Sequence, residues 1–183
     1  MRREDRYDSL FRYYAEEAGL ASVGLDWLNL KAQALAESGL RPDVVSRAGA
    51  VGLAQFMSPT WREWWDGTPG IQEEPHAGGL VDPRDPEDAI KAQAHYMDWL
   101  MRQTGSAWRD ALIAYNWGIG RWRQWAKEPA RALPQETADY VNRVVARWRE
   151  LAGEGRSQRE SLWTSFFRAW ARRSSKSSRP TRW

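Results

Sequence analysis

The sequence predicts an all-α fold. Almost every apolar periodicity in the chain has helical spacing, no segment carries a strong strand pattern, and neither internal repeats nor heptads occur. At 183 residues the chain is long enough to bury a real hydrophobic core as one globular domain. We therefore expect one helical domain, extended by a tail of different composition.

The N-terminal residues predict two helices. The first ends before Gly19 and carries apolar and aromatic residues three and four positions apart. These residues are Tyr7, Leu10, Phe11 and Tyr14. The second opens near Asp26 and ends at Gly39. One face of it is formed by Leu28, Lys31, Ala32 and Leu35.

Further helices are expected along the rest of the chain. TWREWW after Pro59 is helical in pattern, and the Gly- and Pro-rich loop behind it has room for a small hairpin. Longer helices are expected over residues 87–103, 107–117 and 134–152. Inward positions are Ile90, Ala94, Met97 and Leu100 or Met101, then Tyr140, Val141, Val144, Val145 and Trp148. Gly118 and Gly120 are expected to end the helix over 107–117, and a short turn is expected over 121–127.

Charge is distributed unevenly along the chain. Eight Lys and Arg against one acid give residues 156–183 a net charge of +7, which leaves −4 for residues 1–155 of the total of +3. The sequence GEGRSQ marks the junction. We therefore predict a globular domain over residues 1–155, with its core motifs over 26–148, and a basic, aromatic tail over 156–183.

The tail has two interpretations. Aromatic and apolar residues fall there at helical spacing, with arginines around them. They are Leu162, Trp163, Phe166, Phe167 and Trp170, with Arg159, Arg168, Arg172 and Arg173. Such a basic amphipathic helix suits an anionic membrane surface or lipopolysaccharide. The alternative is a last helix that packs its aromatic side chains on the domain, followed by a disordered basic end.

Composition excludes several classes of site. The chain has no cysteine and two histidines, so a disulfide framework is impossible and we expect neither a metal site nor a cofactor. His76 and His95 are expected to be structural or solvated. Gly118 and Gly120 lack the lysine and spacing of a phosphate loop, and no motif supports nucleic-acid binding by the tail. The thirteen tryptophans exceed what a core needs and suit a groove that stacks on sugar faces.

Glu37 is the acidic residue of most interest. It closes the apolar run Ala34, Leu35 and Ala36, and a Pro-, Asp-, Ser- and Gly-rich loop follows it. A carboxyl group among apolar neighbours tends to stay protonated near neutral pH, as a general acid must. The pattern indicates an active site built around one carboxylic acid.

The segment ESGLRPDVVSRAGAVGLAQFMSPTW, residues 37–61, resembles the active-site segment of soluble lytic transglycosylase (SLT) domains, members of the lysozyme superfamily. That segment carries an ES pair, a Pro, S-x-x-G-A-x-G, and Q-x-M with Pro and Thr. The matching residues are Glu37, Ser38, Pro42, Ser46, Gly49, Ala50, Gly52, Gln55, Met57, Pro59 and Thr60.

Three later blocks follow the family order. VDPRDPEDAIKAQAHYMDWLMRQTG resembles D-P-x-x-N-I-x-x-G-x-x-Y-L, ALIAYNWGIGRW resembles A-x-A-Y-N-x-G, and ETADYVNRVV resembles E-T-x-x-Y-V-x-x-V. The four motifs together make a specific signal. Departures are Asp88 and Ala89 near the family's Asn, Ala92 or Ala94 near its Gly, and Ser58–Pro59 in transposed order.

The resemblance implies a lysozyme-like fold with a two-lobed groove. Glu37 would protonate the oxygen of the bond between N-acetylmuramic acid and N-acetylglucosamine in peptidoglycan. It would then take the proton of the muramoyl C6 hydroxyl, which closes on C1 to give a 1,6-anhydro product. Ser46 and Gln55 would bond the sugar or its acetamido group, Tyr115 and Asn116 would line the groove and orient the substrate, and Glu136 would line the groove.

One acid is consistent with this chemistry. Two-carboxylate glycosidases set the two groups about 5–9.5 Å apart, whereas an acetamido substrate can supply its own nucleophile. Asp43 and Glu63 are the other acids close to the motif, and Asp43 beside a Pro is typical of a turn. The alternatives are a hydrolytic muramidase, and a virion structural or tail protein that retains the fold for wall binding.

The sequence also suggests where such an enzyme would act. The N-terminus has no apolar region typical of a secretion signal, and no apolar run approaches a membrane span. We therefore expect a phage or prophage protein that is made in the host cytoplasm and acts on the periplasmic wall. It would be either a lysis enzyme or a virion-associated enzyme, with peptidoglycan, an anionic membrane surface and other virion proteins as partners.

Overall fold

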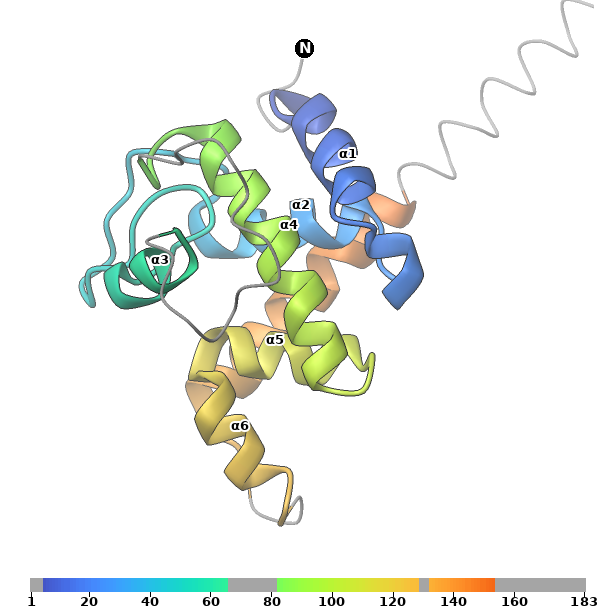
Figure 1. Cartoon of the computed structure of the whole chain (residues 1–183), viewed down its shortest axis with the longest axis vertical. Coiled ribbons are helices and arrows are strands. Elements are labelled where there is room, and N and C mark those ends of the chain that lie inside the picture. The colour runs from blue at the N-terminus through green and yellow to red at the C-terminus, as the bar shows by residue number, and fades with distance from the viewer. Residues whose placement is uncertain (1–4, 66–81, 129–131, 154–183) are drawn as a thin grey trace, which may run out of the picture. The chain divides into compact units, whose positions relative to one another are not determined.

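A computed structural model describes residues 5–65, 82–128 and 132–153 of the chain (Figure 1). Its helices are, in order, α1 (Asp8–Glu17), the 3-10 helix η2 (Leu20–Val23), α2 (Trp27–Ser38), α3 (Ser58–Trp65), α4 (Pro86–Gln103), α5 (Trp108–Trp117) and α6 (Ile119–Trp125). Residues 135–153 form a last helix, here called the 135–153 helix. Within the described residues, β pairing is limited to isolated antiparallel bridges between Val45 and Val51 and between Val51 and Phe56. The all-α prediction is confirmed.

The chain divides into two units, Met1–Trp148 and Arg149–Trp183. The geometry below belongs to the first unit. The predicted boundary after residue 155, the tail helix and the possible hairpin in the loop after Trp65 all lie outside the described residues. In the part of the chain that is described, no helix combines the length and the apolar character that crossing a membrane requires.

Local capping sets the ends of the two long helices that carry the site. The Asp26 side chain accepts hydrogen bonds from the backbone N–H groups of Leu28 and Asn29, and the Asn29 side chain accepts one from the Asp26 N–H. This capping box starts α2, and Gly39 in the left-handed conformation ends it. The Asp85 side chain caps α4 by accepting from the backbone N–H groups of Glu87 and Asp88, ahead of Pro86 in the first turn. These signals are local, so the predicted boundaries agree with the observed ones.

The surroundings of α2 differ from the prediction. Its buried residues are Asn29, Leu30, Lys31, Ala32, Gln33, Ala34 and Ser38, which lie all around the helix, whereas Leu28 and Leu35 of the predicted face are only half-buried. The reason is that α2 packs against α1 and α4 and bonds to the 135–153 helix through Gln33 (Figure 1). The predicted single apolar face of α2 is therefore wrong, because the helix is enclosed by its neighbours.

The buried cation of α2 is paired. The buried Lys31 ammonium lies 2.6 Å from the Asp8 carboxylate on α1. An unpaired buried charge would cost several kcal/mol, so Lys31 needs an acidic partner where α2 lies against α1. The expected inward residues of α4, namely Ile90, Ala94, Met97, Leu100 and Met101, are all buried.

Two predictions around the short elements were wrong. Gly118, with φ of 96°, separates α5 from α6, as expected, but Gly120 lies inside α6 and does not break it. Residues 121–125 are therefore part of a helix that begins at Ile119. The 3-10 helix η2 was not predicted, because its four residues are too few to show a period.

A compact loop over residues 39–57 follows α2 and is here called the 39–57 loop. It is closed by backbone hydrogen bonds from Ser46 N to Ala50 O, from Gly52 N to Val44 O and from Val51 N to Phe56 O. Gly52 has φ of 80°, and a Cβ at this position would lie 1.8 Å from the carbonyl oxygen of Pro83. Glycine is therefore required at residue 52 both by conformation and by space.

Replacing Gly52 with Ala should destabilise the fold by about 3 kcal/mol or more, because left-handed strain adds to a clash with backbone. Gly49 is the matched control, since its φ is 88° but a Cβ there meets nothing within 4 Å. Gly49→Ala should cost only about 1–2 kcal/mol. Chemical denaturation of both variants measures the difference, and equal losses would contradict the contact with Pro83.

Candidate active site

Glu37 is the next-to-last residue of α2, and its side chain is half-buried. Burial raises the pKa of its carboxyl from 4.5 to about 7, because the charged form is poorly solvated there. A hydrogen bond from Tyr140 and the charge of Arg143 lower the pKa by less than burial raises it. A carboxyl with a pKa near neutrality can both give up and take back a proton at neutral pH.

Tyr140 is a site residue that the sequence analysis predicts only as inward-facing. It lies on the 135–153 helix, is 2% exposed, and its hydroxyl oxygen accepts a hydrogen bond of 3.1 Å from Gln33 Nε2. Burial and the neighbouring Glu37 charge raise the pKa of Tyr140 well above its ordinary value. The hydroxyl therefore keeps its proton and donates it in the hydrogen bond to Glu37. The family-like motif ETADYV contains Tyr140 and could have marked it as a site residue.

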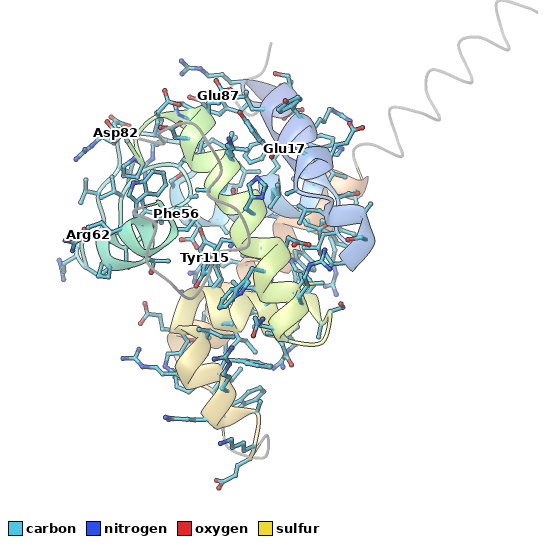
Figure 2. All side chains as sticks on the ribbon, viewed as in Figure 1. Glu17, Phe56, Arg62, Asp82, Glu87 and Tyr115 are labelled. Carbon is cyan, nitrogen blue, oxygen red and sulfur yellow. The ribbon has the colours of Figure 1, made fainter. Side chains whose placement is uncertain are left out.

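Tyr115 lies on α5, close enough to Glu37 that the carboxylate charge, after burial, raises the pKa of its hydroxyl. That hydroxyl donates a 2.8 Å hydrogen bond to the Ala54 carbonyl in the 39–57 loop. Its ring centroid lies 5.8 Å from that of Phe56 and 5.4 Å from that of Tyr96 (Figure 2). Tyr115 thus joins the loop to the helices near the carboxyl, and its predicted roles in lining the groove and orienting the substrate stay predictions.

Ser38, beside Glu37, connects the end of α2 to the 39–57 loop. Its hydroxyl donates to the Leu53 carbonyl at 2.8 Å and accepts from the Arg41 N–H at 3.2 Å. The residue is buried. The family match includes Ser38, but the sequence analysis assigns it no role, because its partner lies fifteen residues along the chain.

Ser46 and Gln55 lie within the 39–57 loop and hold it together. The Ser46 hydroxyl accepts from the Ala50 N–H at 2.9 Å. Gln55, which has φ of 53°, donates from Nε2 to the carbonyls of Val44 and Gly52 at 3.2 and 2.8 Å. Both side chains are half-buried, and their predicted contacts with a sugar stay predictions.

Asn116 and Glu136 are exposed. Asn116 follows Tyr115 near the end of α5, and Glu136 lies in the first turn of the 135–153 helix. Their groove-lining roles stay predictions. Asp43 is exposed on the 39–57 loop, and the side chain of Glu63 lies outside the described residues.

The histidines and acids do not form a metal centre in the described part of the chain. No group of three or more His, Cys, Asp or Glu side chains is placed there to hold an ion. His95 Nε2 lies 2.7 Å from the Glu17 carboxylate, which links α4 to α1. His76 lies outside the described residues.

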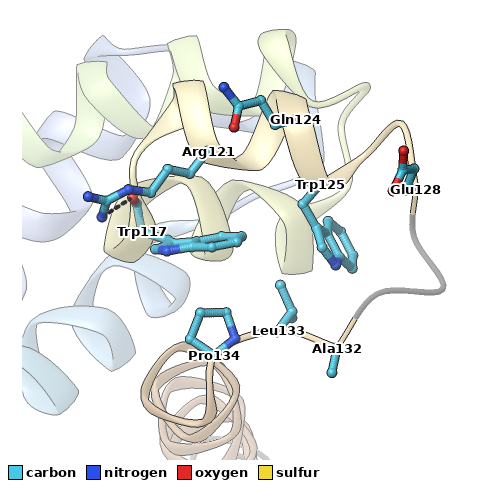
Figure 3. A pocket seen from close by; sticks show the side chains of 8 residues that line it. All are labelled: Trp117, Arg121, Gln124, Trp125, Glu128, Ala132, Leu133 and Pro134. Atoms are coloured by element: carbon cyan, nitrogen blue, oxygen red, sulfur yellow. Dashed lines mark hydrogen bonds between the residues drawn. The ribbon is translucent and has the colours of Figure 1, made fainter.

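A pocket of about 610 Å³ opens between α6 and the start of the 135–153 helix (Figure 3). It is lined by Trp117, Arg121, Gln124, Trp125, Glu128, Ala132, Leu133 and Pro134. Glu37 is not among these residues, but Trp117 is the second residue after Tyr115. Two indole rings with one cation and one anion beside them suit a ligand that has both apolar faces and charged groups.

Replacing Glu37 with Gln should stabilise the protein at alkaline pH. The folded-state pKa of about 7 exceeds the ordinary value of 4.5, so the folded state loses stability as pH rises from the lower to the higher value. Glutamine carries no charge, so the variant should gain about 1–3 kcal/mol over wild type near pH 8, and the gain should vanish below about pH 5.

Thermal unfolding across this pH range measures the difference. Glu136→Gln, a change at an exposed carboxyl, is the control and should follow wild type at every pH. A gain for Glu37→Gln that is the same at all pH values would contradict a raised pKa.

Comparison with known proteins agrees with this geometry. The family model of the transglycosylase SLT domain matches residues 17–137. The membrane-bound lytic murein transglycosylase F of Haemophilus influenzae is 30% identical over 121 residues, which are 63% of this chain and 21% of that protein. The corresponding protein of Pasteurella multocida is 31% identical over 102 residues, 52% of this chain and 18% of its own length.

Solved structures show the same fold. The lytic transglycosylase Slt of Pseudomonas aeruginosa, solved as an inactive mutant with glutamine in place of a glutamate, superposes with a TM-score of 0.63 at 26% identity. The match covers 79% of this chain and 23% of that one. The 70-kDa soluble lytic transglycosylase of Escherichia coli gives 0.61 at 28% identity, over 81% of this chain and 25% of its own. The chain thus spans about a fifth to a quarter of these relatives, and it belongs to the transglycosylase SLT domain family, with a lysozyme-like fold.

Proposed function

We propose that this chain is a peptidoglycan lytic transglycosylase. It cleaves the β-1,4 bond between N-acetylmuramic acid and N-acetylglucosamine and leaves a 1,6-anhydro-muramoyl end. The observation that carries the proposal is the half-buried Glu37 carboxyl with a pKa of about 7, hydrogen-bonded by Tyr140 and near Tyr115 in an SLT-family fold.

In the first step, the protonated Glu37 carboxyl donates its proton to the glycosidic oxygen as the bond to muramoyl C1 breaks. Positive charge develops at C1, and the carboxylate left behind accepts the hydrogen bond of the Tyr140 hydroxyl. In the second step, this carboxylate removes the proton of the C6 hydroxyl, whose oxygen bonds to C1. The acid is regenerated and no water is consumed.

The electrostatics of Glu37 favour one carboxyl over two. In the described residues the pKa of Glu37 is raised by burial, and no neighbouring carboxylate is among the groups that act on it. A second carboxylate about 5–5.5 Å away, as in retaining two-acid enzymes, would couple strongly to Glu37. The remaining nucleophile must therefore come from the substrate or from water.

Two relatives support the same assignment. The Pseudomonas aeruginosa enzyme is inactive as a glutamate-to-glutamine mutant, and the 70-kDa soluble lytic transglycosylase binds bulgecin A. We assign the glutamate role to Glu37 and the glycan to a groove along Tyr115 and Asn116. We assign the pocket at Trp117 and Trp125 to the same glycan site, because flat indole faces stack on sugar rings.

The mass of the reaction products tests the proposal. Digestion of purified peptidoglycan should yield muropeptides one water lighter than hydrolysis products. Glu37→Gln should lose at least about 10³-fold of the activity, because the acid is removed, while Glu16→Gln, a change at an exposed carboxyl of α1, keeps most of it. Products with reducing ends would show that the chain is a muramidase, and clearing by Glu37→Gln would contradict the site. Binding of glycan without cleavage by the wild-type chain would favour the virion structural role.

We further propose that the enzyme acts in phage lysis or wall entry, and that the basic tail binds an anionic membrane surface. The arginines bordering the aromatic residues of 156–183 support this placement. Truncation after Gly155 should leave the cleavage of purified peptidoglycan unchanged, because the catalytic residues precede it, but reduce killing of intact Gram-negative cells several-fold. A full-length variant with Arg168, Arg172 and Arg173 changed to Gln keeps the length of the tail and removes three positive charges, so it shows whether charge or length is needed for killing. Equal killing by all forms would reject the tail proposal.

A further inference from the structure

A buried chain of polar side chains leads from α4 through α2 to the Tyr140 hydroxyl. Gln93 Nε2 on α4 donates to Gln33 Oε1 on α2 at 3.1 Å. Gln33 Nε2 donates to the Tyr140 hydroxyl at 3.1 Å. Both glutamines are 0% exposed and Tyr140 is 2% exposed. Burying two primary amides costs free energy unless they form hydrogen bonds inside the protein.

The hydrogen bonds of this series all donate in one direction, from Gln93 toward Tyr140, and a backbone carbonyl fixes that direction. Gln93 Nε2 also donates to the Leu30 carbonyl oxygen at 3.2 Å, and this oxygen can only accept. The Gln93 amide nitrogen must therefore face Leu30 and Gln33, although its own oxygen is left buried with no hydrogen-bond partner among the described residues. Gln33 must in turn present its oxygen to Gln93 and its nitrogen to Tyr140.

The last bond of the chain follows from the first two. A hydroxyl that accepts from Gln33 cannot donate to Gln33, so its single proton is available for the Glu37 carboxyl. If the Gln33 amide turned over, its oxygen would face Tyr140 and compete with Glu37 for that proton. We propose that Gln33 and Gln93 are positioning residues, which keep the Tyr140 hydroxyl donating to Glu37.

The hydrogen bond between Gln93 and Gln33 is a feature of this protein and is not part of the family pattern quoted above. In D-P-x-x-N-I-x-x-G-x-x-Y-L, matching Ile90 and Tyr96 to the I and Y puts the glycine at Gln93, rather than at Ala92 or Ala94. A glycine there has no side chain with which to hold Gln33.

The consequence is a pH dependence with a definite sign. The titratable groups that face Glu37 are Tyr140 and Arg143 from the 135–153 helix and Tyr115 from α5, with Tyr96 of α4 next to Tyr115. Donation by Tyr140 lowers the pKa of Glu37. Loss of that donation raises the pKa, so the carboxyl stays protonated, and the enzyme active, to a higher pH.

The test is a set of variants of the full chain. Gln93→Met frees the Gln33 amide to turn over. The apparent pKa on the alkaline side of the kcat–pH profile should then rise by about 0.5–1 unit, because the hydrogen bond from Tyr140 to the Glu37 carboxylate is partly lost. KM should be unchanged. The double variant Gln33→Met with Gln93→Met removes the amide that competes for the proton, and its apparent pKa should return toward wild type. Thr104→Val is the control, since Thr104 is buried on the end of α4 and bonds only to its own helix.

The same variants are followed by NMR titration of ¹³C-labelled glutamate, with the Glu37 signal assigned from the spectrum of Glu37→Gln. This readout needs no substrate, so it tests the positioning role even if the proposed reaction, on which the inference rests, is wrong. In a Tyr140→Phe background, adding Gln93→Met should shift the Glu37 titration no further. An unchanged titration in Gln93→Met, or a double variant that shifts as far as Gln93→Met does, would overturn the proposal.

Discussion

The enclosure of α2 is the constraint on which the rest of the structure depends. A helix packed on α1 and α4 and bonded to the 135–153 helix cannot keep its polar residues in water, so each must find a partner inside. Lys31 pairs with Asp8, and Gln33 with Gln93 and Tyr140. The same enclosure surrounds the end of α2, where it raises the pKa of the Glu37 carboxyl. Packing and chemistry thus have one cause.

Under the proposed function, this arrangement sets stability against catalysis at Glu37. A carboxyl held near a pKa of 7 is destabilising when it ionises, yet that is the property that lets one group act as acid and then as base. Tyr140 and Arg143 limit the cost by favouring the charged form. The balance between burial and these two groups, rather than burial alone, decides where the carboxyl titrates.

The 39–57 loop is held against this centre from several sides. Ser38 fastens it to α2 through the Leu53 carbonyl, Tyr115 fastens it to α5 through the Ala54 carbonyl, and Gly52 lets it pass close to Pro83. Gln55 closes it internally. A loop secured by backbone carbonyls on both sides keeps a fixed shape without a large core of its own, as the proposed glycan site requires.

The sequence by itself determined the all-α class, the long helices and their ends, because capping by Asp26 and Asp85 and termination at Gly39 act over a few residues. It also identified Glu37, since the family motif is contiguous around it. Tertiary structure alone decided that α2 has buried residues all around it and that Tyr140 lies beside Glu37, with Gln33 and Gln93 bonded in series behind it. These partners come from three helices, with Gln33 separated from Tyr140 by 107 residues and from Gln93 by 60. A local pattern carries no record of such contacts, because they exist only once the helices have packed.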